Sequence, residues 1–540
     1  MASMNADRPN IVFVLTDDQG YWAMGCAGND EVETPNLDRI AAMGMRFENF
    51  FCASPVCSPA RASILTGRMP SQHGVHDWLR KGNMIATKTP GQGWGDDREI
   101  EYLQGLTGYT DVLAENGYVC GISGKWHLGD SIEPQKGFSY WHLFPYGGGD
   151  YHNATIIRNG AIERDPRYLT DVITEGGLKF LDEQAGSDAP FYLSVHYTAP
   201  HSPWHEGQHP ESLVARYENC PFQTCPVVPG GHPWQINGAP RGKGEKRREL
   251  LSGYYGAITG LDRGVGQILD RLESMGVLEN TLILFTSDNG MNMGHHGIWG
   301  KGNGTFPQNM YDTSVKVPML IARPGDLPEG VVVDALLSHY DIMPTLLDYL
   351  GFEIPEADTL PGQSFAGQLR GNPESGREEV VVYDEYGPVR MIRTRVWKYV
   401  HRYPYGPHEL YNLGTDPEET QNLIDDEAYH NRVVEMRARL QAWFNNYVDP
   451  DRDGAREPVT GKGQIERVGS LGQGRRAFED DWWYIDEDGN RRDDKAWFFG
   501  RIVEAKEQTQ LPTIHDYVMH NRIVNEEHRR SSEHSDRRAA

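Results

Sequence analysis

Residues 10–20 read NIVFVLTDDQG, a continuous apolar run followed by acidic and turn-forming residues. An uninterrupted apolar run of this length is typical of a strand that is buried on both faces. Residues 281–290, TLILFTSDNG, repeat the pattern, again with an acidic residue directly after the run. Strands of this kind belong to sheets that carry helices on both sides. The two stretches predict an α/β fold with polar groups at the ends of its central strands.

The rest of the first 350 residues or so alternates between helical and strand patterns. We expect helices over residues 35–43, 109–116, 169–183 and 250–275, and further strands over residues 118–123, 191–197 and 317–322. This alternation predicts a large, mainly parallel sheet sandwiched by helices, in which ligands bind beyond the carboxyl ends of the strands. Residues 204–246 are rich in Pro, Gly and His and are expected to form a long loop near the pocket.

The sequence changes in character after about residue 375. Residues 380–384 and 390–401 have the pattern of antiparallel strands, and residues 427–444 that of a long helix. We therefore expect three parts, which are an N-terminal catalytic domain (1–372), a smaller α+β subdomain with an antiparallel sheet (373–447) and a C-terminal extension (448–540).

The extension is charged and carries an aromatic cluster at residues 482–484 and 497–499. We expect it to wrap its own domain or to join the subunits of a homo-oligomer. Its last residues have the composition of a disordered tail.

The composition argues against several classes of function. A formal net charge of −25 over 540 residues opposes binding to nucleic acid or to an anionic membrane. No apolar run is long enough for a transmembrane helix. Residues 1–9 lack the apolar part of a signal peptide, so the protein is expected to be cytoplasmic if Met4 is the native start, and periplasmic or secreted if a signal has been removed. Six cysteines in so long a chain predict free thiols, with a pair between Cys220 and Cys225 as the alternative.

Residues 57–67, CSPARASILTG, predict a short helix with a reactive position at its start. Ser58 suits the N-cap and Pro59 the first helical position. Cys57 would then lie just ahead of the helix, where backbone N–H groups and the helix dipole favour an anion. Arg61 falls in the first turn, where a cation disfavours the helix, so an anion beside Cys57 is its expected partner. A buried cysteine before an ordinary helix is the alternative.

Acidic and amide side chains follow the two buried strands, namely Asp17, Asp18, Asp288 and Asn289. Their hard oxygen ligands suit Ca²⁺ or Mg²⁺ rather than zinc, and several carboxylates with an amide favour Ca²⁺. Either stretch taken alone is equally consistent with a turn, because Asp, Asn and Gly dominate turns.

Basic side chains follow other predicted strands. They lie in GKWHLG (124–129), PHSP (200–203) and GIWGKG (297–302), and they are Lys125, His127, His201 and Lys301. Any one of them alone would most often be a solvated loop residue. The strands that precede these segments should end at the same edge of the sheet, which favours a common site.

Taken together, these motifs resemble the type I sulfatases, the formylglycine-dependent family of the alkaline phosphatase superfamily. Residues 57–67 are the most specific part of the match, and the similarity extends over roughly residues 8–445. The resemblance implies an alkaline phosphatase-like fold and an enzyme that hydrolyses a sulfate ester. It also implies that a formylglycine-generating enzyme converts Cys57 to 3-oxoalanine (formylglycine), whose aldehyde hydrate is the nucleophile.

The resemblance further implies roles for individual residues. One divalent cation, preferably Ca²⁺ with Mg²⁺ as the alternative, would be bound by Asp17, Asp18, Asp288, Asn289 and the modified Cys57. Sulfate binding and proton transfer would fall to Arg61, Lys125, His127, His201 and Lys301. Asp288 would accept the proton of the nucleophile, and His201 or Lys301 would protonate the departing alcohol. His127 would then assist the release of sulfate.

The substrate is less well defined by the sequence, which points to a sulfated carbohydrate or a small alkyl or aryl sulfate. Residues 73–80, HGVHDWLR, follow the nucleophile helix and are candidates for contacts with the leaving group, although a well-packed loop is an equally good interpretation. The candidate substrate contacts are His76, Asp77, Trp78 and Arg80, together with His296 from the GHHG stretch.

Two alternative functions remain open. Phosphonate monoester and phosphodiester hydrolases of the same superfamily act on similar tetrahedral anions and resemble this chain. A catalytically silent protein that binds sulfated ligands would lack one of the site residues, and none is missing in this sequence.

Overall fold

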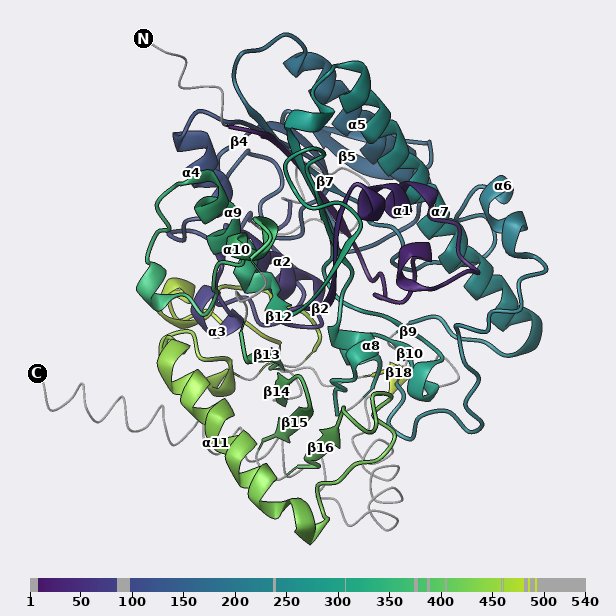
Figure 1. Cartoon of the computed structure of the whole chain (residues 1–540), viewed down its shortest axis with the longest axis vertical. Helices are drawn as coiled ribbons and strands as arrows, with labels where there is room; N and C mark the ends of the chain where they lie inside the picture. Colours follow the sequence, from purple (N-terminus) through teal and green to yellow (C-terminus); the bar gives the residue numbers. More distant parts are fainter. Residues whose placement is uncertain are drawn as a thin grey trace, which may run out of the picture.

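A computed structural model describes residues 8–84, 98–236, 239–305, 307–372, 377–385, 389–403, 406–457, 459 and 461–479, with two further short strands, Tyr484–Ile485 and Arg491–Arg492. These residues form a large α/β layer with a smaller sheet beside it (Figure 1). The predicted aromatic cluster of the extension and the start of the chain lie outside the residues whose side chains are described.

The first apolar stretch forms strand β1 (Asn10–Thr16), and all of its residues are buried. Ile11 and Phe13 belong to one hydrophobic core, whereas Val12 and Val14 belong to a second core on the other face of the sheet. Because successive side chains of a strand point to opposite faces, a strand between two cores must be apolar throughout. The predicted α/β fold is confirmed.

The described strands of the large sheet lie in the order β12-β2-β11-β8-β1-β7-β3-β4-β5-β6. Besides β1 they are β2 (Gly44–Phe51), β3 (Val119–Lys125), β4 (Phe138–Phe144), β5 (Ala154–Arg158), β6 (Ala161–Asp165), β7 (Phe191–His196), β8 (Thr281–Ser287), β11 (Met319–Ala322) and β12 (Val331–Ser338). The central strands β8, β1, β7, β3 and β4 run parallel, as predicted.

The outer part of the sheet is more mixed than the sequence analysis predicted. β11 runs antiparallel to both β2 and β8, and β5 is antiparallel to β4 and β6. β5 and β6 are joined by Asn159-Gly160, whose φ values of 49° and 79° are those of a tight hairpin turn. A two-residue turn of this kind can only reverse the chain, so this edge cannot be parallel.

Helices cover both faces of the sheet (Figure 1). One face carries α1 (Pro35–Ala42), α5 (Leu169–Gln184) and α7 (Gly244–Ser274), and the other carries α2 (Cys57–Thr66), α4 (Tyr109–Glu115), α9 (Ile342–Leu350) and α10 (Ala366–Leu369).

Helix α7 begins before the predicted start at Leu250. Its first residues, GEKRRE, are charged and largely exposed, so the apolar periodicity begins only after the helix has started. The expected long loop over residues 204–246 is interrupted by the short helix α6 (Glu211–Val214) and by the start of α7.

The smaller sheet consists of β13 (Glu379–Asp384), β14 (Val389–Thr394), β15 (Trp397–Arg402) and β16 (Glu409–Asn412), all antiparallel, with α11 (His430–Tyr447) packed against it (Figure 1). Buried Lys398 joins this sheet to the large layer, because its Nζ lies 2.6 Å from Asp312 Oδ1 and also contacts Glu419. A buried ammonium must be paired, so this contact fixes how the two sheets meet.

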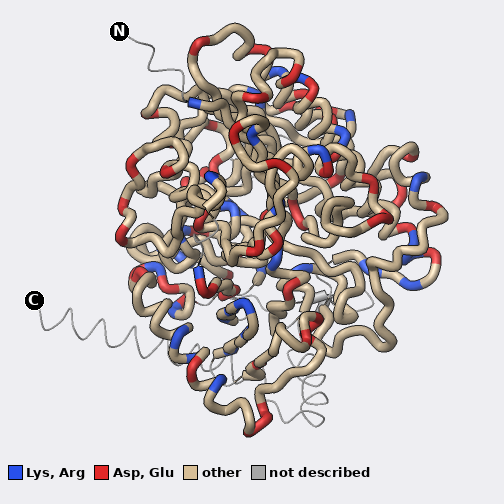
Figure 2. Tube along the Cα trace, in the orientation of Figure 1, with Lys and Arg blue, Asp and Glu red and all other residues tan. Residues whose placement is uncertain are grey.

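Acidic residues are spread around the outside of the described chain (Figure 2), in line with the net charge. Within the described ranges, no helix combines the length and apolarity needed to cross a lipid bilayer. All six cysteines are free thiols, as expected.

Candidate functional site

The carboxyl ends of the central parallel strands lie next to one another. In the sheet register, Thr16 of β1 is level with Ser287 of β8, and Leu15 is level with His196 of β7. His196 is in turn level with Gly124 of β3. The residues that end or follow these four strands therefore share one edge of the sheet, as the sequence analysis predicted for the basic segments.

Cys57 is the first residue of α2, with extended Val56 before it. The prediction that Ser58 caps this helix is wrong. The Ser58 hydroxyl instead donates to the His127 carbonyl at 2.9 Å and accepts from the Leu79 N–H at 3.1 Å, so it is unavailable to the helix. Cys57 therefore lies within the first turn, is only 4% exposed, and sits where the helix dipole favours negative charge.

Four buried side chains offer a metal-binding arrangement next to this helix. Ligand atoms of Asp17, Asp18, Cys57 and Asp288 all lie within 4.8 Å of one another. Asn289 donates its amide N–H to Asp18 Oδ1 at 2.8 Å, while its own Oδ1 is buried and has no hydrogen-bond partner among the described residues. A buried acceptor without a donor is costly, and a cation would satisfy it. Hard oxygen donors of this kind suit Ca²⁺ or Mg²⁺.

Three cationic side chains face the carboxylates. Lys125 pairs with Asp17, and Lys301 Nζ lies 2.5 Å from Asp18 Oδ1 and 2.9 Å from Cys57 Sγ.

Arg61 donates from Nε to Asp288 Oδ2 at 3.0 Å, so its partner is an anion close to Cys57, as expected for a cation in the first turn of this helix. It also donates to the Lys125 carbonyl at 3.1 Å. Since each buried charge has an opposite neighbour, the charges can remain away from water.

The buried charges of this cluster shift the pKa values of its members in different directions. Burial alone would raise the pKa of Asp288, but Arg61 and Lys125 outweigh burial and hold it below its usual value. Burial also acts on Cys57, and with Asp17 beside it the pKa of the thiol rises to about 12. Lys301 behaves in the opposite way, because its acidic neighbours raise its pKa despite burial. The cluster therefore combines ionised Asp288 and Lys301 with an unreactive thiol at neutral pH.

His127 has one free ring nitrogen. Its Nε2 lies 3.2 Å from the Leu79 carbonyl, which can only accept, so Nε2 carries the hydrogen. Nδ1 is buried and has no hydrogen-bond partner within the described part of the chain. Burial, with Lys125 and Arg61 nearby, lowers the pKa of His127 well below its usual value. The neutral ring thus presents a lone pair that can accept a proton.

In His201 it is Nδ1, rather than Nε2, that is hydrogen-bonded to a backbone carbonyl. Its Nδ1 donates to the Ser202 carbonyl at 2.7 Å, which leaves Nε2 directed at Asp18, 3.7 Å from Oδ2. A proton carried on Nε2 would therefore point into the carboxylate cluster. Neutral His127 offers a proton acceptor at Nδ1, whereas His201 offers a donor at Nε2 only when its ring carries hydrogens on both nitrogens.

The predicted leaving-group residues lie against the C-terminal extension. A His76 ring nitrogen lies 2.8 Å from the Arg452 carbonyl, and Arg80 pairs with Glu479 at 2.6 Å. Asp77 is fully buried and accepts from the Gly463 N–H at 3.1 Å, and burial raises its pKa to about 7.

Trp78 and His296, the other two predicted substrate contacts, also contact residues of the protein itself. Trp78 is half-buried, and its backbone carbonyl accepts from the Gln464 N–H at 2.8 Å. His296 stacks on Tyr311 with 3.8 Å between ring centroids. The role of these residues as substrate contacts stays a prediction.

Sequence reasoning missed two parts of the site. Gly147 and Gly148 lie against the rings of His127 and His201, and Arg452, Gly463 and Gln464 of the extension contact the loop after the nucleophile helix. The first carries a local signal, because three consecutive glycines begin three residues after the end of β4. The second depends on contacts between residues almost 400 positions apart, for which the sequence has no local sign.

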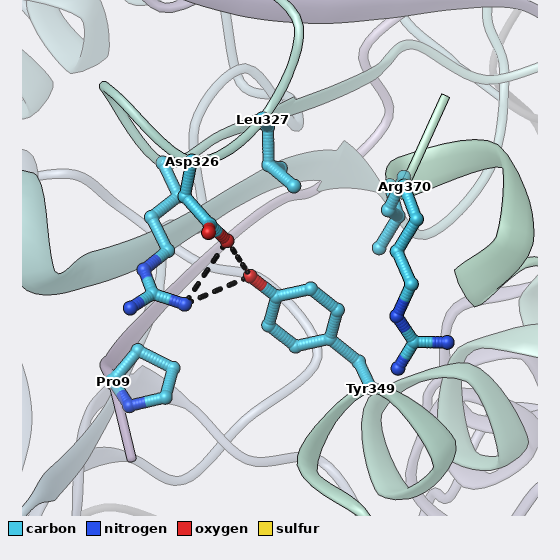
Figure 3. A pocket seen from close by; sticks show the side chains of 7 residues that line it. Pro9, Asp326, Leu327, Tyr349 and Arg370 are labelled. Carbon is cyan, nitrogen blue, oxygen red and sulfur yellow. Dashed lines mark hydrogen bonds and ion pairs between the residues drawn. The ribbon is translucent and has the colours of Figure 1, made fainter. Parts of the chain in front are cut away.

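A separate pocket lies elsewhere on the molecule (Figure 3). Pro9, which lines it, precedes β1, so the pocket is at the opposite end of this strand from Asp17. There Asp326 accepts from the Tyr349 hydroxyl at 2.5 Å and pairs with Arg323 at 3.1 Å. None of the predicted site residues, all of which are described, lines this pocket. It is distinct from the candidate active site.

The fold places charged and potential ligand groups beyond the carboxyl ends of its parallel strands, where sheets of this kind bind ligands. The sulfatase family model matches residues 9–352, and a model described as the C-terminal region of N-sulphoglucosamine sulphohydrolase matches residues 294–446. The chain therefore belongs to the sulfatase family, whose members hydrolyse sulfuric esters.

Individual relatives agree with this assignment. An N-acetylglucosamine-6-O-sulfatase of Bacteroides thetaiotaomicron is 27% identical over 532 residues, covering 84% of this chain and 89% of the relative. A structure solved with its substrate, D-glucosamine-2-N,6-O-disulfate, has a TM-score of 0.68 at 24% identity and covers 83% of this chain and 99% of that one. The phosphonate monoester hydrolase of Agrobacterium radiobacter has a TM-score of 0.60 at 22% identity, covering 81% and 96%. At these identities the two structures show a shared fold.

Proposed function

We propose that this enzyme hydrolyses the sulfate ester of a carbohydrate, or of a small alkyl or aryl alcohol, to the alcohol and inorganic sulfate. The observation that carries the proposal is the buried arrangement around position 57. Cys57 lies at a helix start between Lys301 and a group of carboxylates, in a chain of the sulfatase family. Such a site combines a position for a nucleophile with cations that can face a sulfate group.

We propose that one divalent cation, Ca²⁺ in preference to Mg²⁺, is held by Asp17, Asp18, Asp288, Asn289 and the group at position 57. The unpartnered Asn289 Oδ1 and the closely spaced carboxylates support this ligand set. When bound, the cation supplies charge for the sulfate oxygens and lowers the pKa of an oxygen nucleophile.

We further propose that a formylglycine-generating enzyme converts Cys57 to formylglycine. In this step an oxidant used by that enzyme takes up two electrons, an oxygen atom replaces the sulfur on Cβ, and the sulfur leaves as sulfide. The hydrated aldehyde then supplies two hydroxyl groups on one carbon, one to attack sulfur and one to allow sulfate to leave. The match of residues 57–67 to the signature of the family supports this modification.

The residues around the nucleophile divide the remaining tasks. Lys125 and Lys301 face the negative charge of the sulfate group. As the bond between sulfur and the alcohol oxygen breaks, His201 Nε2 or Lys301 Nζ gives a proton to that oxygen. His127 Nδ1 then accepts a proton as sulfate leaves. Over the whole cycle, water supplies the oxygen and the protons that the products gain.

Saccharide sulfates are the favoured substrates. The relative from Bacteroides thetaiotaomicron is named for a sulfated amino sugar, and a structural neighbour was solved with another. The fold shared with a phosphonate monoester hydrolase makes phosphonate monoesters and phosphodiesters the alternative substrates.

The test uses the full chain, coexpressed with a formylglycine-generating enzyme and purified with Ca²⁺. Release of sulfate from sulfated monosaccharides and an aryl sulfate is compared with hydrolysis of an aryl phosphonate and an aryl phosphodiester. We expect kcat/KM to be higher for a sulfate ester, and the peptide containing residue 57 to be lighter than the cysteine form by mass spectrometry. Faster hydrolysis of the phosphonate or the phosphodiester would favour the alternative.

A further inference from the structure

Two consecutive glycines lie against the two histidines of the site. Gly147 and Gly148 belong to a run of three glycines that follows β4. A Cβ built on Gly147 would lie 2.5 Å from Cε1 of His127, and one on Gly148 would lie 2.7 Å from Cε1 of His201. Cβ atoms essentially never come within 3.0 Å of a neighbouring atom, so only glycine leaves both rings where they are.

The next residue provides an internal comparison. A Cβ on Gly149 would meet only the far edge of the Phe144 ring, at 3.6 Å, which is an ordinary contact. The three glycines share one exposed to half-buried turn and none has a positive φ. Alanine therefore suits the backbone at all three positions, and what distinguishes Gly147 and Gly148 is the ring that each one faces.

Each imidazole is fixed from two sides. The Leu79 carbonyl holds His127 through Nε2 and the Ser202 carbonyl holds His201 through Nδ1, while the glycine backbone limits the space beside each ring. A hydrogen bond alone leaves a ring free to tilt about that bond. The close approach of the backbone restricts this tilt, and with it the direction of the catalytic nitrogen.

We propose that Gly147 and Gly148 are positioning residues that act on different halves of the reaction. Gly148 holds His201 so that Nε2 faces the departing alcohol, and Gly147 holds His127 so that Nδ1 takes the proton when sulfate leaves. This inference rests on the proposed function. It adds that the turn after β4 separately controls the two proton transfers.

The two substitutions have different kinetic signatures. In Gly148→Ala the displaced His201 protonates the alcohol poorly, so a sugar or alkyl sulfate is slowed more than nitrophenyl sulfate, whose leaving group needs little protonation. In Gly147→Ala the alcohol leaves normally but sulfate leaves slowly. This produces a rapid first release of alcohol, followed by a slow rate that is the same for all leaving groups.

The experiment compares Gly147→Ala, Gly148→Ala and Gly149→Ala in the full-length enzyme, with alcohol and sulfate release followed separately. We expect losses of about 10²-fold in the affected step for the first two variants, and wild-type kinetics for Gly149→Ala. Equal behaviour of all three variants, or identical signatures for the first two, overturns the inference. A wild type that releases no sulfate while hydrolysing a phosphonate overturns the proposed function instead.

A double variant tests whether any loss of stability in Gly147→Ala comes from the clash between the new methyl group and the His127 ring. If Gly147→Ala lowers the melting temperature, the double variant His127→Ala/Gly147→Ala should restore it to the value of His127→Ala, because the smaller side chain makes room for the new methyl group. Failure of this compensation shows that the methyl group is not excluded by the ring, and overturns the inference for Gly147.

Discussion

The two sides of the candidate site are built in different ways. The side that faces the sulfate group consists of residues at the ends of neighbouring strands, with Asp17 directly after β1 and Asp288 directly after β8. The predicted leaving-group side consists of residues 74–80, in which Gly74 and Leu79 contact Gln464 of the extension. The first side is fixed by the core of the sheet, whereas the second depends on a segment outside the matches to the family models. If residues 74–80 contact the substrate as predicted, the chemistry and the selectivity of the enzyme rest on separate parts of the chain.

If this division holds, changes on the sulfate side remove turnover for every substrate. The largest effect is expected for Cys57→Ala, which deletes the proposed nucleophile while leaving the fold intact. Cys52→Ala is a matched control, because Cys52 is a fully buried cysteine five residues earlier that is not among the candidate metal ligands. Turnover of an aryl sulfate and thermal unfolding are measured for both variants. Activity of Cys57→Ala close to that of Cys52→Ala would refute the assignment.

The second expected effect concerns the proposed cation. Asp18→Asn removes a charge that the cation and Lys301 share, and we expect activity to fall by at least about 10²-fold. Chelation of the wild type should have the same effect, with Ca²⁺ restoring more activity than Mg²⁺. Asp270→Asn serves as a control, because the Asp270 side chain is 72% exposed and pairs with Arg39, which is not among the candidate site residues. A chelator-resistant enzyme would contradict the metal assignment.

The sequence predicts the sulfate side well because its determinants are local. An unbroken apolar run predicts a buried strand, and the residues after it must lie at the edge of the sheet. The position of Asp17, Asp288 and Lys125 at one edge followed from this rule. Strand β2, by contrast, was missed, because its alternation of buried and partly exposed residues directly follows the end of a predicted helix.

The contacts that hold the predicted leaving-group side in place could not be read from the sequence, for a physical reason. His76 and Arg80 have polar groups that a substrate could bind, and the sequence alone has no means to show that Arg452 and Glu479 already contact them. Tertiary contacts between distant segments leave no periodic pattern. The reverse error occurred at Ser58, which has the ideal composition of a helix cap but uses its hydroxyl to join two other segments.

The third prediction concerns pH and the attachment of the extension. Burial raises the pKa of Asp77 from 3.8 to about 7, so folding favours its protonated form. The stabilising contribution is complete below about pH 4 and is lost as the pH rises towards 7. At 1.36 kcal/mol per pKa unit, the loss corresponds to roughly 4 kcal/mol. We expect Asp77→Asn to reduce this pH dependence in denaturant unfolding, and an unchanged slope would show that Asp77 does not titrate in this range.

The smallest effect is expected at Gln464, which joins the extension to the loop without touching the sulfate side. Its fully buried side chain accepts from the His76 N–H and donates to the Gly74 carbonyl, both at 2.9 Å. Gln464→Ala leaves these two groups without partners, at a cost of about 2–3 kcal/mol in the free energy of unfolding. Exposed Gln441 of α11 provides the control, with an expected change below about 0.5 kcal/mol for Gln441→Ala.

Kinetics decide whether this loop belongs to the leaving-group side. The backbone of Leu79 pairs with Gln464 and also forms hydrogen bonds with His127 and Ser58. Loss of the Gln464 side chain is therefore expected to shift residues 74–80 next to the nucleophile. We expect Gln464→Ala to raise KM for a sulfated sugar more than for a small aryl sulfate, because only the larger alcohol would extend as far as residues 74–80. Equal changes for both substrates would mean that the extension stabilises the fold without shaping the binding site, and the division between the two sides would then be structural only.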